Sequence, residues 1–245
     1  IVMGGGVGIG SHGRHRVVTE RTRLAMPETG IGYLPDVGAT WLLPRAPGET
    51  GTWMGLTGET VGAADAIFAG LADLSVPSER LGELVEALGS LSLGVGDDEV
   101  RALIESFRVV PEPGRLAAQQ DLINRTFSFD AVEDIVAALQ TERDPFATET
   151  LALIGKRSPT SLKLALRLLR RGRQSSSLVE CLEREFTAAC EVLRQHDFFE
   201  GVRAAVIDKD RKPQWRPASL AEVRDADLGR YFAADHPVLF PDHRL

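Results

Sequence analysis

The sequence predicts an α/β protein whose N-terminal third carries short strands and tight turns and whose remainder is mainly helical. Two observations predict this class. Residues 1–75 are rich in glycine and proline and contain short apolar runs, which is typical of short strands joined by turns and brief helices. From about residue 78 the apolar residues recur with helical spacing. We therefore expect a boundary near residues 76–80, with an α/β part over 1–77 and a mainly helical part over 78–245.

The N-terminal third begins with apolar runs that predict strands, at residues 1–3, 16–18, 24–26 and 71–76. A helix is expected over residues 61–69, and Gly70 should end it, because glycine readily adopts the left-handed conformation that follows many helices. The run at residues 1–3 has the composition of the end of a buried strand. We therefore expect an upstream part of the fold to lie outside this sequence.

The first well-marked helix of the remainder is expected to start at Ser158, an N-cap residue that is followed by Pro159 at the first helical position. Gly172 is expected to end this helix. Its apolar residues recur at helical spacing and should form one buried face: Leu162, Ala165, Leu166 and Leu169.

A capping box over residues 177–180 predicts the start of a second helix. A third helix is expected over residues 196–207, before a basic, tryptophan-containing stretch at 209–215, and residues 216–245 should wrap the surface. The apolar face of the second helix is predicted to consist of Leu178, Leu182, Phe186, Ala189 and Leu193.

Composition and charge restrict the classes of function. The chain has 245 residues, 43% of them hydrophobic, which is enough to bury a sizeable core. A formal net charge of −7 argues against a general binder of nucleic acid or of membrane surfaces, although a local basic patch could still hold a small anion. No apolar run is long enough to span a bilayer, and no leader peptide is recognisable. We therefore expect a cytoplasmic protein that binds neither membranes nor nucleic acid.

The two cysteines, Cys181 and Cys190, fall on one predicted helix. Nine residues of helix rise by roughly 13 Å, which is too far for a disulfide. This spacing is consistent with a reducing compartment.

The glycine run from Gly4 to Gly8 is the first candidate functional feature. Glycines without a Cβ can present backbone N–H groups to a developing oxyanion, and the start of a helix adds a favourable dipole. Two alternatives stay open at this point. Residues 8–13 match the G-x-G-x-x-G dinucleotide pattern, but no long apolar helix follows them. The run could also be a tight turn without a ligand.

Two acidic residues, Glu28 and Asp36, follow within one short span. Glycine and proline residues between them prevent a shared helix, but two turn segments could still converge on one cleft. An apolar setting would raise the pKa of such a carboxyl toward that of a working general base. The alternative is that both residues are solvated or cap a turn. His12 and His15 lie nearby, but no cluster has metal-ligand spacing, so we expect no metal site.

Several segments together resemble the 3-hydroxyisobutyryl-CoA hydrolases of the crotonase (enoyl-CoA hydratase/isomerase) superfamily. The resemblance runs along nearly the whole chain, and its last two segments are specific to the hydrolase branch. The segments that carry it are Met3-Gly-Gly-Gly-Val-Gly-Ile9, Leu24-Ala-Met-Pro-Glu28, Gly32-Tyr-Leu-Pro-Asp-Val-Gly38, Ser158-Pro-Thr-Ser-Leu-Lys163 and residues 196–215.

This resemblance implies a crotonase-like spiral of ββα units followed by a mainly helical C-terminal region. It implies that Gly5, between Gly4 and Gly6, supplies one oxyanion-hole N–H, and that Glu28 and Asp36 are the catalytic carboxylates. In this family the second oxyanion N–H and much of the CoA cradle come from a segment upstream of the glycine run. The implied partners are therefore an acyl-CoA substrate and either further copies of the chain or a second chain or segment that supplies the upstream part.

The function implied is hydrolysis of a CoA thioester, with 3-hydroxyisobutyryl-CoA yielding 3-hydroxyisobutyrate and CoA in valine breakdown. No cofactor is expected, since CoA is part of the substrate. Hydratases of similar sequence carry a glutamate two residues after the glycine triplet, where this chain has Gly8.

Lys209 and Lys212 could meet the CoA phosphates, or belong to a solvated basic tail. The alternatives are an enoyl-CoA hydratase or isomerase, and a non-catalytic acyl-CoA-binding subunit. The acyl-chain preference stays open.

Overall fold

The N-terminal third contains two pairs of short parallel strands. A computed structural model describes residues 1–233 and 238–240 of the chain. In it, β1 (Val2–Met3) pairs with β3 (Leu24–Ala25), and β2 (Val17–Val18) pairs with β4 (Leu74–Ser75). Parallel strands need crossover connections, and here α1 (Gly5–Gly10) lies within the crossover that links β1 to the later strands. The strands predicted from the apolar runs are thus confirmed. The first one is less buried than expected, because Ile1 is 92% exposed.

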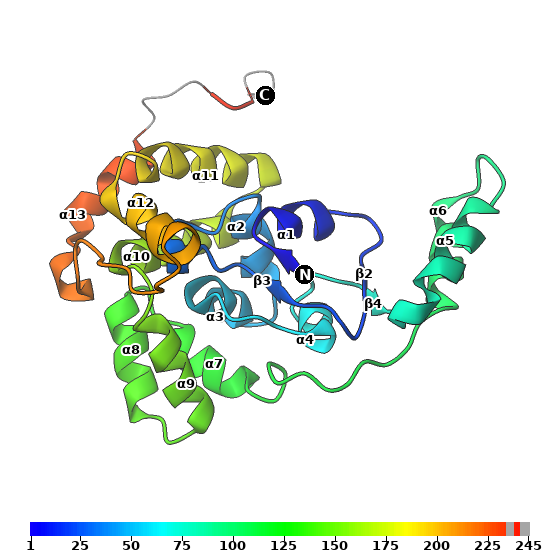
Figure 1. The fold of residues 1–245 in the computed structure, drawn as a ribbon, viewed down its shortest axis with the longest axis horizontal. Coiled ribbons are helices and arrows are strands. Elements are labelled where there is room, and N and C mark those ends of the chain that lie inside the picture. Colours follow the sequence, from blue (N-terminus) through cyan, green and yellow to red (C-terminus); the bar gives the residue numbers. More distant parts are fainter. Residues whose placement is uncertain (234–237, 241–245) are drawn as a thin grey trace.

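Short helices complete this part of the chain and lie around the strands (Figure 1). They are the 3₁₀ helix η1 (Glu28–Ile31), α2 (Ala39–Leu42), the 3₁₀ helix η2 (Leu43–Arg45), α3 (Thr50–Thr57) and α4 (Ala63–Phe68). Every residue of α3 is buried. Gly70 has a φ of +72° directly after α4, which confirms the predicted helix end.

A hairpin of two helices projects from one end of the molecule (Figure 1). It consists of α5 (Leu81–Gly89) and α6 (Asp97–Glu105), preceded by the 3₁₀ helix η3 (Ser78–Arg80). Its buried residues form a small cluster with β4 that is separate from the main core. A segment without regular helix or strand then runs back to α7 (Gln120–Phe127).

The remaining helices pack against the N-terminal third and against one another (Figure 1). In order they are α8 (Val132–Thr141), α9 (Pro145–Ile154), α10 (Pro159–Gln174), α11 (Leu178–Val192), α12 (His196–Val202), the π-helix η4 (Arg203–Ile207), the 3₁₀ helix η5 (Leu220–Glu222), α13 (Asp225–Leu228) and the 3₁₀ helix η6 (Gly229–Phe232). The largest core cluster takes residues from both sides of residue 77, from Val7 to Leu169. The domain boundary proposed there stays a prediction.

Helix α10 is the central element of the fold. Its start at Ser158 is confirmed, since the Ser158 hydroxyl accepts a hydrogen bond from the Ser161 N–H at 3.1 Å. The predicted end at Gly172 is wrong, because the helix continues to Gln174. Gly172 is instead a point of close approach, where a Cβ would overlap the carbonyl of Thr40.

Both sides of α10 are buried, rather than the single apolar face that the spacing predicted. Leu162, Ala165, Leu166 and Leu169 belong to the main core. Leu164 and Leu168 belong to a second cluster with α11, α13 and η6.

The predicted apolar face of α11 is displaced from the observed one. Leu193 is 47% exposed, and the buried residues are Cys181, Glu185, Ala188 and Val192. Each buried residue comes one position before a residue of the predicted face. The reason is that α11 turns the acidic residue Glu185 inward, where it has partners, and hydrophobic spacing alone does not anticipate this.

Candidate active site

The glycine run forms the start of a helix, as the oxyanion interpretation, one of three, expected. Gly4 is the N-cap of α1 with a φ of +51°, and its carbonyl accepts hydrogen bonds from Val7 and Gly8. Within the described residues, the N–H groups of Gly5 and Gly6 have no backbone acceptor. A Cβ at Gly5 would meet no atom within 4 Å, so the space on the side-chain side of this residue is open. The geometry suits an oxyanion contact, while the role itself stays a prediction.

Glu28 lies beside this helix start. A Cβ at Gly4 would come within 2.9 Å of Glu28 Oε1, so the carboxyl and the glycine run are in close contact. The side chain is buried, and Oε2 has no hydrogen-bond partner. Burial, together with a smaller effect of the negative charge of Asp36, raises the pKa of Glu28 to about 8. A buried carboxyl with an unpaired oxygen costs folding free energy, which is typical of a functional group rather than a structural one.

Asp36 lies close enough to interact electrostatically with Glu28, which is eight positions earlier in the chain. It is partly buried, and burial raises its pKa, while a hydrogen bond from the Tyr33 hydroxyl acts in the opposite direction. The Tyr33 ring packs against Phe198 of α12 with centroids 5.4 Å apart. The structure therefore brings together the glycine run and both acidic residues that the sequence singled out.

A strained turn follows Asp36 directly. Val37 has a φ of +55°, which is rare for a β-branched residue, and Gly38 follows with a φ of +83°. The Val37 side chain packs against α1, where a Cβ at Gly8 would lie only 2.5 Å from Val37 Cβ. His12 Nε2 lies 3.1 Å from the Val37 carbonyl oxygen. The turn thus connects Asp36 to the glycine helix.

Glu185 of α11 holds the other side of this turn. Its carboxylate accepts hydrogen bonds from the Gly38 N–H at 2.8 Å, the Thr40 N–H at 2.9 Å and the Thr40 hydroxyl at 2.6 Å. Burial raises the pKa of Glu185 to about 7, these hydrogen bonds oppose the increase, and the charge of Asp36 adds to it. Sequence analysis missed this residue. The available signal was that Glu185, an acidic residue, lies between Leu182 and Phe186 of the predicted apolar face.

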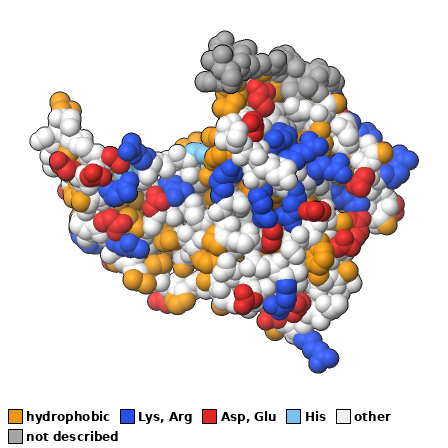
Figure 2. Space-filling view, turned by 180° about the vertical axis from the view of Figure 1, so that it is seen from behind, with side chains coloured by type: hydrophobic (Ala, Val, Ile, Leu, Met, Phe, Trp, Pro, Cys, Tyr) orange, Lys and Arg blue, Asp and Glu red, His pale blue; other side chains and the backbone are white. Residues whose placement is uncertain are grey.

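The basic residues predicted to meet CoA phosphates are not part of this cluster. Lys209 and Lys212 are exposed on the segment after η4, and no contact joins either side chain to Glu28 or Asp36 among the residues described. Their role stays a prediction. Lys and Arg side chains also gather in the middle of the face shown in Figure 2. Several arginines of α10 are paired with acidic side chains, for example Arg170 and Arg173 with Glu49.

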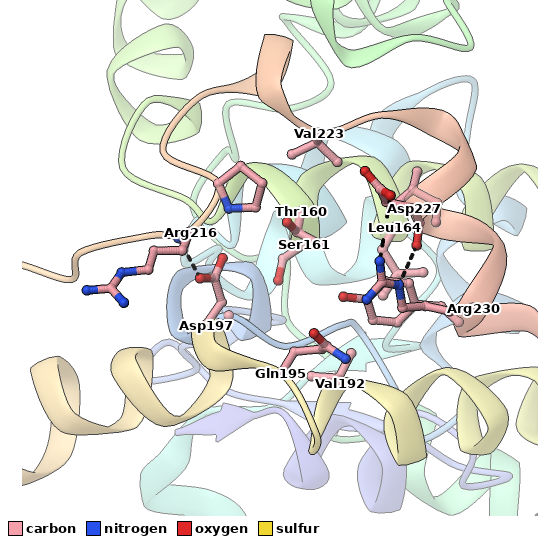
Figure 3. Close-up of a pocket in the computed structure, with 14 residues that line it drawn as sticks. Thr160, Ser161, Leu164, Val192, Gln195, Asp197, Arg216, Val223, Asp227 and Arg230 are labelled. Atoms are coloured by element: carbon pink, nitrogen blue, oxygen red, sulfur yellow. Dashed lines mark hydrogen bonds and ion pairs between the residues drawn. The ribbon is translucent and has the colours of Figure 1, made fainter.

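A cavity of about 120 Å³ lies between α10, the end of α11, α12 and the C-terminal segment (Figure 3). Of the segment that carries Glu28 and Asp36, only Gly32 lines it. Several of its polar groups already have partners. Asp197 accepts from the Ser158 hydroxyl and from the Arg216 N–H, and Arg230 lies 3.6 Å from Asp227. Because no buried polar atom is left unpaired here among the described residues, the chemistry is better sought at Glu28.

Metal ligation and membrane insertion receive no support from the residues described. Within 1–233 and 238–240, no group of His, Cys, Asp and Glu side chains is arranged to hold a metal ion. None of the helices in the same ranges combines the length and apolar character that crossing a bilayer requires.

Comparisons with known proteins place this arrangement in a family. The profile of the enoyl-CoA hydratase/isomerase family matches residues 1–232. The chain belongs to this family. The match agrees with the resemblance that the glycine run, the two acidic segments and residues 158–163 and 196–215 carry.

Curated relatives and solved structures of the family are similar over most of the chain. The mitochondrial 3-hydroxyisobutyryl-CoA hydrolase of Rattus norvegicus is 44% identical over 95% of this chain and 61% of its own length. A carnitinyl-CoA dehydratase from Mycobacterium thermoresistibile superposes with a TM-score of 0.90 at 44% identity, covering 98% of this chain and 67% of that one. An enoyl-CoA hydratase from Rhodobacter sphaeroides superposes with a TM-score of 0.84 at 41% sequence identity. This match covers 95% of this chain and 65% of the hydratase chain.

These matches confirm the expected crotonase-like α/β fold. The chain spans about three fifths of the length of the curated relatives that it matches. The relatives' names also divide between hydrolases and hydratases, so the choice between these activities depends on the site.

Proposed function

We propose that the protein hydrolyses the CoA thioester of a short 3-hydroxy acid, with 3-hydroxyisobutyryl-CoA as the first candidate. The observation that carries this proposal is the buried Glu28 carboxyl with its unpaired Oε2, next to the glycine run and coupled to Asp36. The name of the rat relative supports the substrate.

The reaction needs an electrophile, water and a place for negative charge. The thioester carbonyl oxygen would accept a hydrogen bond from the Gly5 N–H as it becomes an oxyanion. On one route, Glu28 removes a proton from water, the water oxygen attacks the carbonyl carbon, and the carbon–sulfur bond breaks to release CoA thiolate. On the other, Glu28 attacks the carbon itself, CoA leaves, and water then hydrolyses the resulting anhydride. On both routes one proton of the attacking water finally reaches the CoA thiolate, so that the products are one carboxylic acid and one thiol.

Asp36 has a different part in this scheme. Its carboxylate is less buried than that of Glu28 and accepts from Tyr33. It can accept a hydrogen bond from the 3-hydroxyl of the substrate, which would orient the acyl group. It could also assist proton transfer to the leaving thiolate.

Gly8 favours hydrolysis over hydration. Hydration by two glutamates would need a second carboxylate at residue 8, but a Cβ there would lie 2.5 Å from Val37 Cβ. A side chain at this position therefore requires the turn after Asp36 to move. The second carboxylate that the site offers is Asp36, on the opposite side of that turn.

The enoyl-CoA hydratase activity remains the second candidate, because two similar structures carry the names of a hydratase and a dehydratase. A third candidate is a subunit that binds acyl-CoA without turnover. These candidates differ in a measurable product: hydrolysis releases a free thiol, hydration consumes a double bond, and the binding subunit does neither.

The test measures thiol release from 3-hydroxyisobutyryl-CoA by the purified full-length protein, and loss of the double bond from the matching enoyl-CoA. We expect thiol release, and we expect Glu28→Gln to lower kcat by about 10²–10⁴-fold, the range typical of a positioned acid or base. Asp36→Asn should also lower kcat while CoA binding is retained. Thermal melting controls for folding. Hydration without thiol release, or full activity of both variants, would refute the proposal.

We also propose three further properties of the protein, which concern its cofactors, its location and its oligomeric state. The scheme uses only water and the residues named, so neither a metal nor an additional cofactor is required. A cytoplasmic location follows from the sequence expectation, whereas the rat relative's name describes that protein as mitochondrial. A homo-oligomer is expected from the resemblance, and sedimentation of the full-length protein would measure it.

A further inference from the structure

We infer that Glu185 is a positioning residue that fixes Asp36 by holding the turn of residues 36–40 from helix α11. This inference rests on the proposed function, since it assigns Glu185 a part in the same site. Glu185 does not itself touch the predicted reacting atoms. It would act through the backbone of the turn.

The contacts of Glu185 are directed at this turn alone among the hydrogen bonds of the described residues. Oε2 accepts from the Gly38 N–H, and Oε1 accepts from both the N–H and the hydroxyl of Thr40. The carboxylate comes from a residue 147 positions later in the chain and is 3% exposed. It therefore caps the start of the short helix α2 from outside, in the place that an N-cap side chain normally occupies.

The turn needs such support because its conformation is unfavourable. Val37 is β-branched and has a φ of +55°, a combination that strains the backbone. Such a residue keeps its conformation only where the surroundings hold it. Glu185 holds the Gly38 and Thr40 side, and the contacts with Gly8 and His12 hold the side of α1.

Asp36 is connected through the main chain to the residues that Glu185 holds. Its carbonyl accepts the Ala39 N–H at 2.9 Å, so the backbone of Asp36 is part of the turn that Glu185 caps. If the Gly38 end is released, the strained residue 37 can relax and the Asp36 carboxyl moves relative to Glu28. Misplacement of a catalytic group by about 1 Å can reduce a rate by about 10²-fold.

The central variant is Glu185→Gln in the full-length protein. Its amide keeps the shape and one acceptor, but its NH₂ group must face one of the N–H donors of the turn, which removes that hydrogen bond. We expect kcat for thiol release to fall by about 10- to 100-fold with KM changed by less than about twofold, because CoA contacts are untouched.

Glu49→Gln is the matched control. Glu49 is also buried, precedes the short helix α3, and accepts hydrogen bonds from Thr52 and from the guanidinium groups of Arg170 and Arg173. It makes no contact with the turn. Its replacement should lower thermal stability and leave kcat unchanged. If Glu185→Gln does not fold, Thr40→Val removes one of the three hydrogen bonds and should give a smaller decrease in kcat.

A second readout does not depend on turnover. In ¹⁵N-labelled protein, hydrogen exchange of the Ala39 N–H, which donates to the Asp36 carbonyl, reports directly whether the turn is closed. We expect this exchange to accelerate in Glu185→Gln and to stay at the wild-type rate in Glu49→Gln.

The two readouts separate the possible failures. If wild-type protein hydrolyses the thioester but Glu185→Gln keeps both kcat and the slow exchange of the Ala39 N–H, the inference is wrong and the proposed function stands. If wild-type protein releases no thiol but the Ala39 N–H exchanges faster in Glu185→Gln, the hold of Glu185 on the turn stands and the proposed function falls.

Discussion

At the scale of single residues, the site is defined by three neighbouring acidic side chains, of which Glu28 and Glu185 are buried and Asp36 is partly buried. Burial raises the pKa of Glu28, Asp36 and Glu185. The charge of Asp36 adds to this increase for the other two. In the described part of the chain none of them forms an ion pair. Environments that separate the pKa values of neighbouring carboxyls allow one group to hold a proton while another stays ionised.

The first prediction concerns the pH dependence of thiol release. With a pKa of about 8, only about one tenth of Glu28 is ionised at pH 7. Both proposed routes use the ionised form, so kcat/KM should rise with pH and level off above about pH 8. The residual activity of Asp36→Asn should show this rise at lower pH, because a charge that raises the Glu28 pKa is gone. A rate that falls over this range would contradict the assignment.

The second prediction concerns Gly8. Alanine in place of glycine within a helix normally stabilises by up to about 1 kcal/mol. At Gly8 we expect the opposite, a loss of about 1–3 kcal/mol in unfolding free energy, because the new Cβ would meet Val37. Urea unfolding of the Gly8→Ala variant measures this loss. Gly10→Ala is the control in the same helix, since its Cβ would lie 3.9 Å from the nearest atom, in Val2. Equal stability of the two variants would show that the Val37 side chain can move away from residue 8 at little cost in free energy.

Sequence reasoning identified part of this site. Glu28, Asp36 and the glycine run lie close together in sequence and carry motifs, so they could be named in advance. Glu185 and the strained Val37 could not. Glu185 becomes part of the site only when α11 packs on the turn, and a positive φ at valine has no sequence signature.

At the scale of elements, helix starts are set by local contacts. Ser158 and Ser177 both accept hydrogen bonds from the N–H two or three residues into their helices. These starts were predicted correctly because a cap needs only neighbouring residues. The capping box at residues 177–180 is modified, since the Glu180 carboxylate accepts from Ser176 rather than from Ser177. The end of α10 was mispredicted because Gly172 serves a contact with Thr40, distant in sequence.

The third prediction compares these two caps. Ser158→Ala removes the cap of α10 and also the hydroxyl that donates to buried Asp197 at 2.6 Å. We expect the free energy of unfolding to fall by about 2–4 kcal/mol. Loss of a cap costs about 1 kcal/mol, and a buried acceptor left without its partner adds about 1–3 kcal/mol. Ser177→Ala loses only a cap, so its free energy of unfolding should fall by about 1 kcal/mol. Denaturant unfolding of both variants tests the difference, and equal losses would contradict it.

At the scale of the whole molecule, the projecting hairpin of α5 and α6 contrasts with the doubly buried α10. The hairpin has its own small hydrophobic cluster and is attached through β4 and the segment after α6. α10 contributes to two clusters. Regions with few buried contacts open locally at lower free energy than a core helix does.

The fourth prediction follows from this contrast. Amide hydrogens of α5 and α6 should exchange with solvent faster than those of α10. Ile104→Ala, in the hairpin cluster, should increase exchange in α5 and α6 and leave α10 unchanged. Equal acceleration in α10 would mean that the hairpin and the core unfold together.

The overall architecture was predictable to different degrees in the two parts of the chain. The strands and helices of the N-terminal third follow from short local patterns. The crotonase-like arrangement followed from the resemblance, because parallel pairs such as β1–β3 join segments that no local pattern connects. The projection of the hairpin was not anticipated, since hydrophobic spacing shows that a helix has an apolar face but not what covers it.

The cluster of carboxyl groups at Glu28, Asp36 and Glu185 bears on what happens after the chemical step. If a thioester is cleaved here, the acid formed loses a proton and becomes an anion beside Asp36, and at pH values of about 8 and above also beside ionised Glu28. Among the described residues, none of the three carboxyls forms an ion pair that would offset this charge. Repulsion would then speed its departure, oppose resynthesis, and make the free hydroxy acid a poor inhibitor even where the intact thioester binds well.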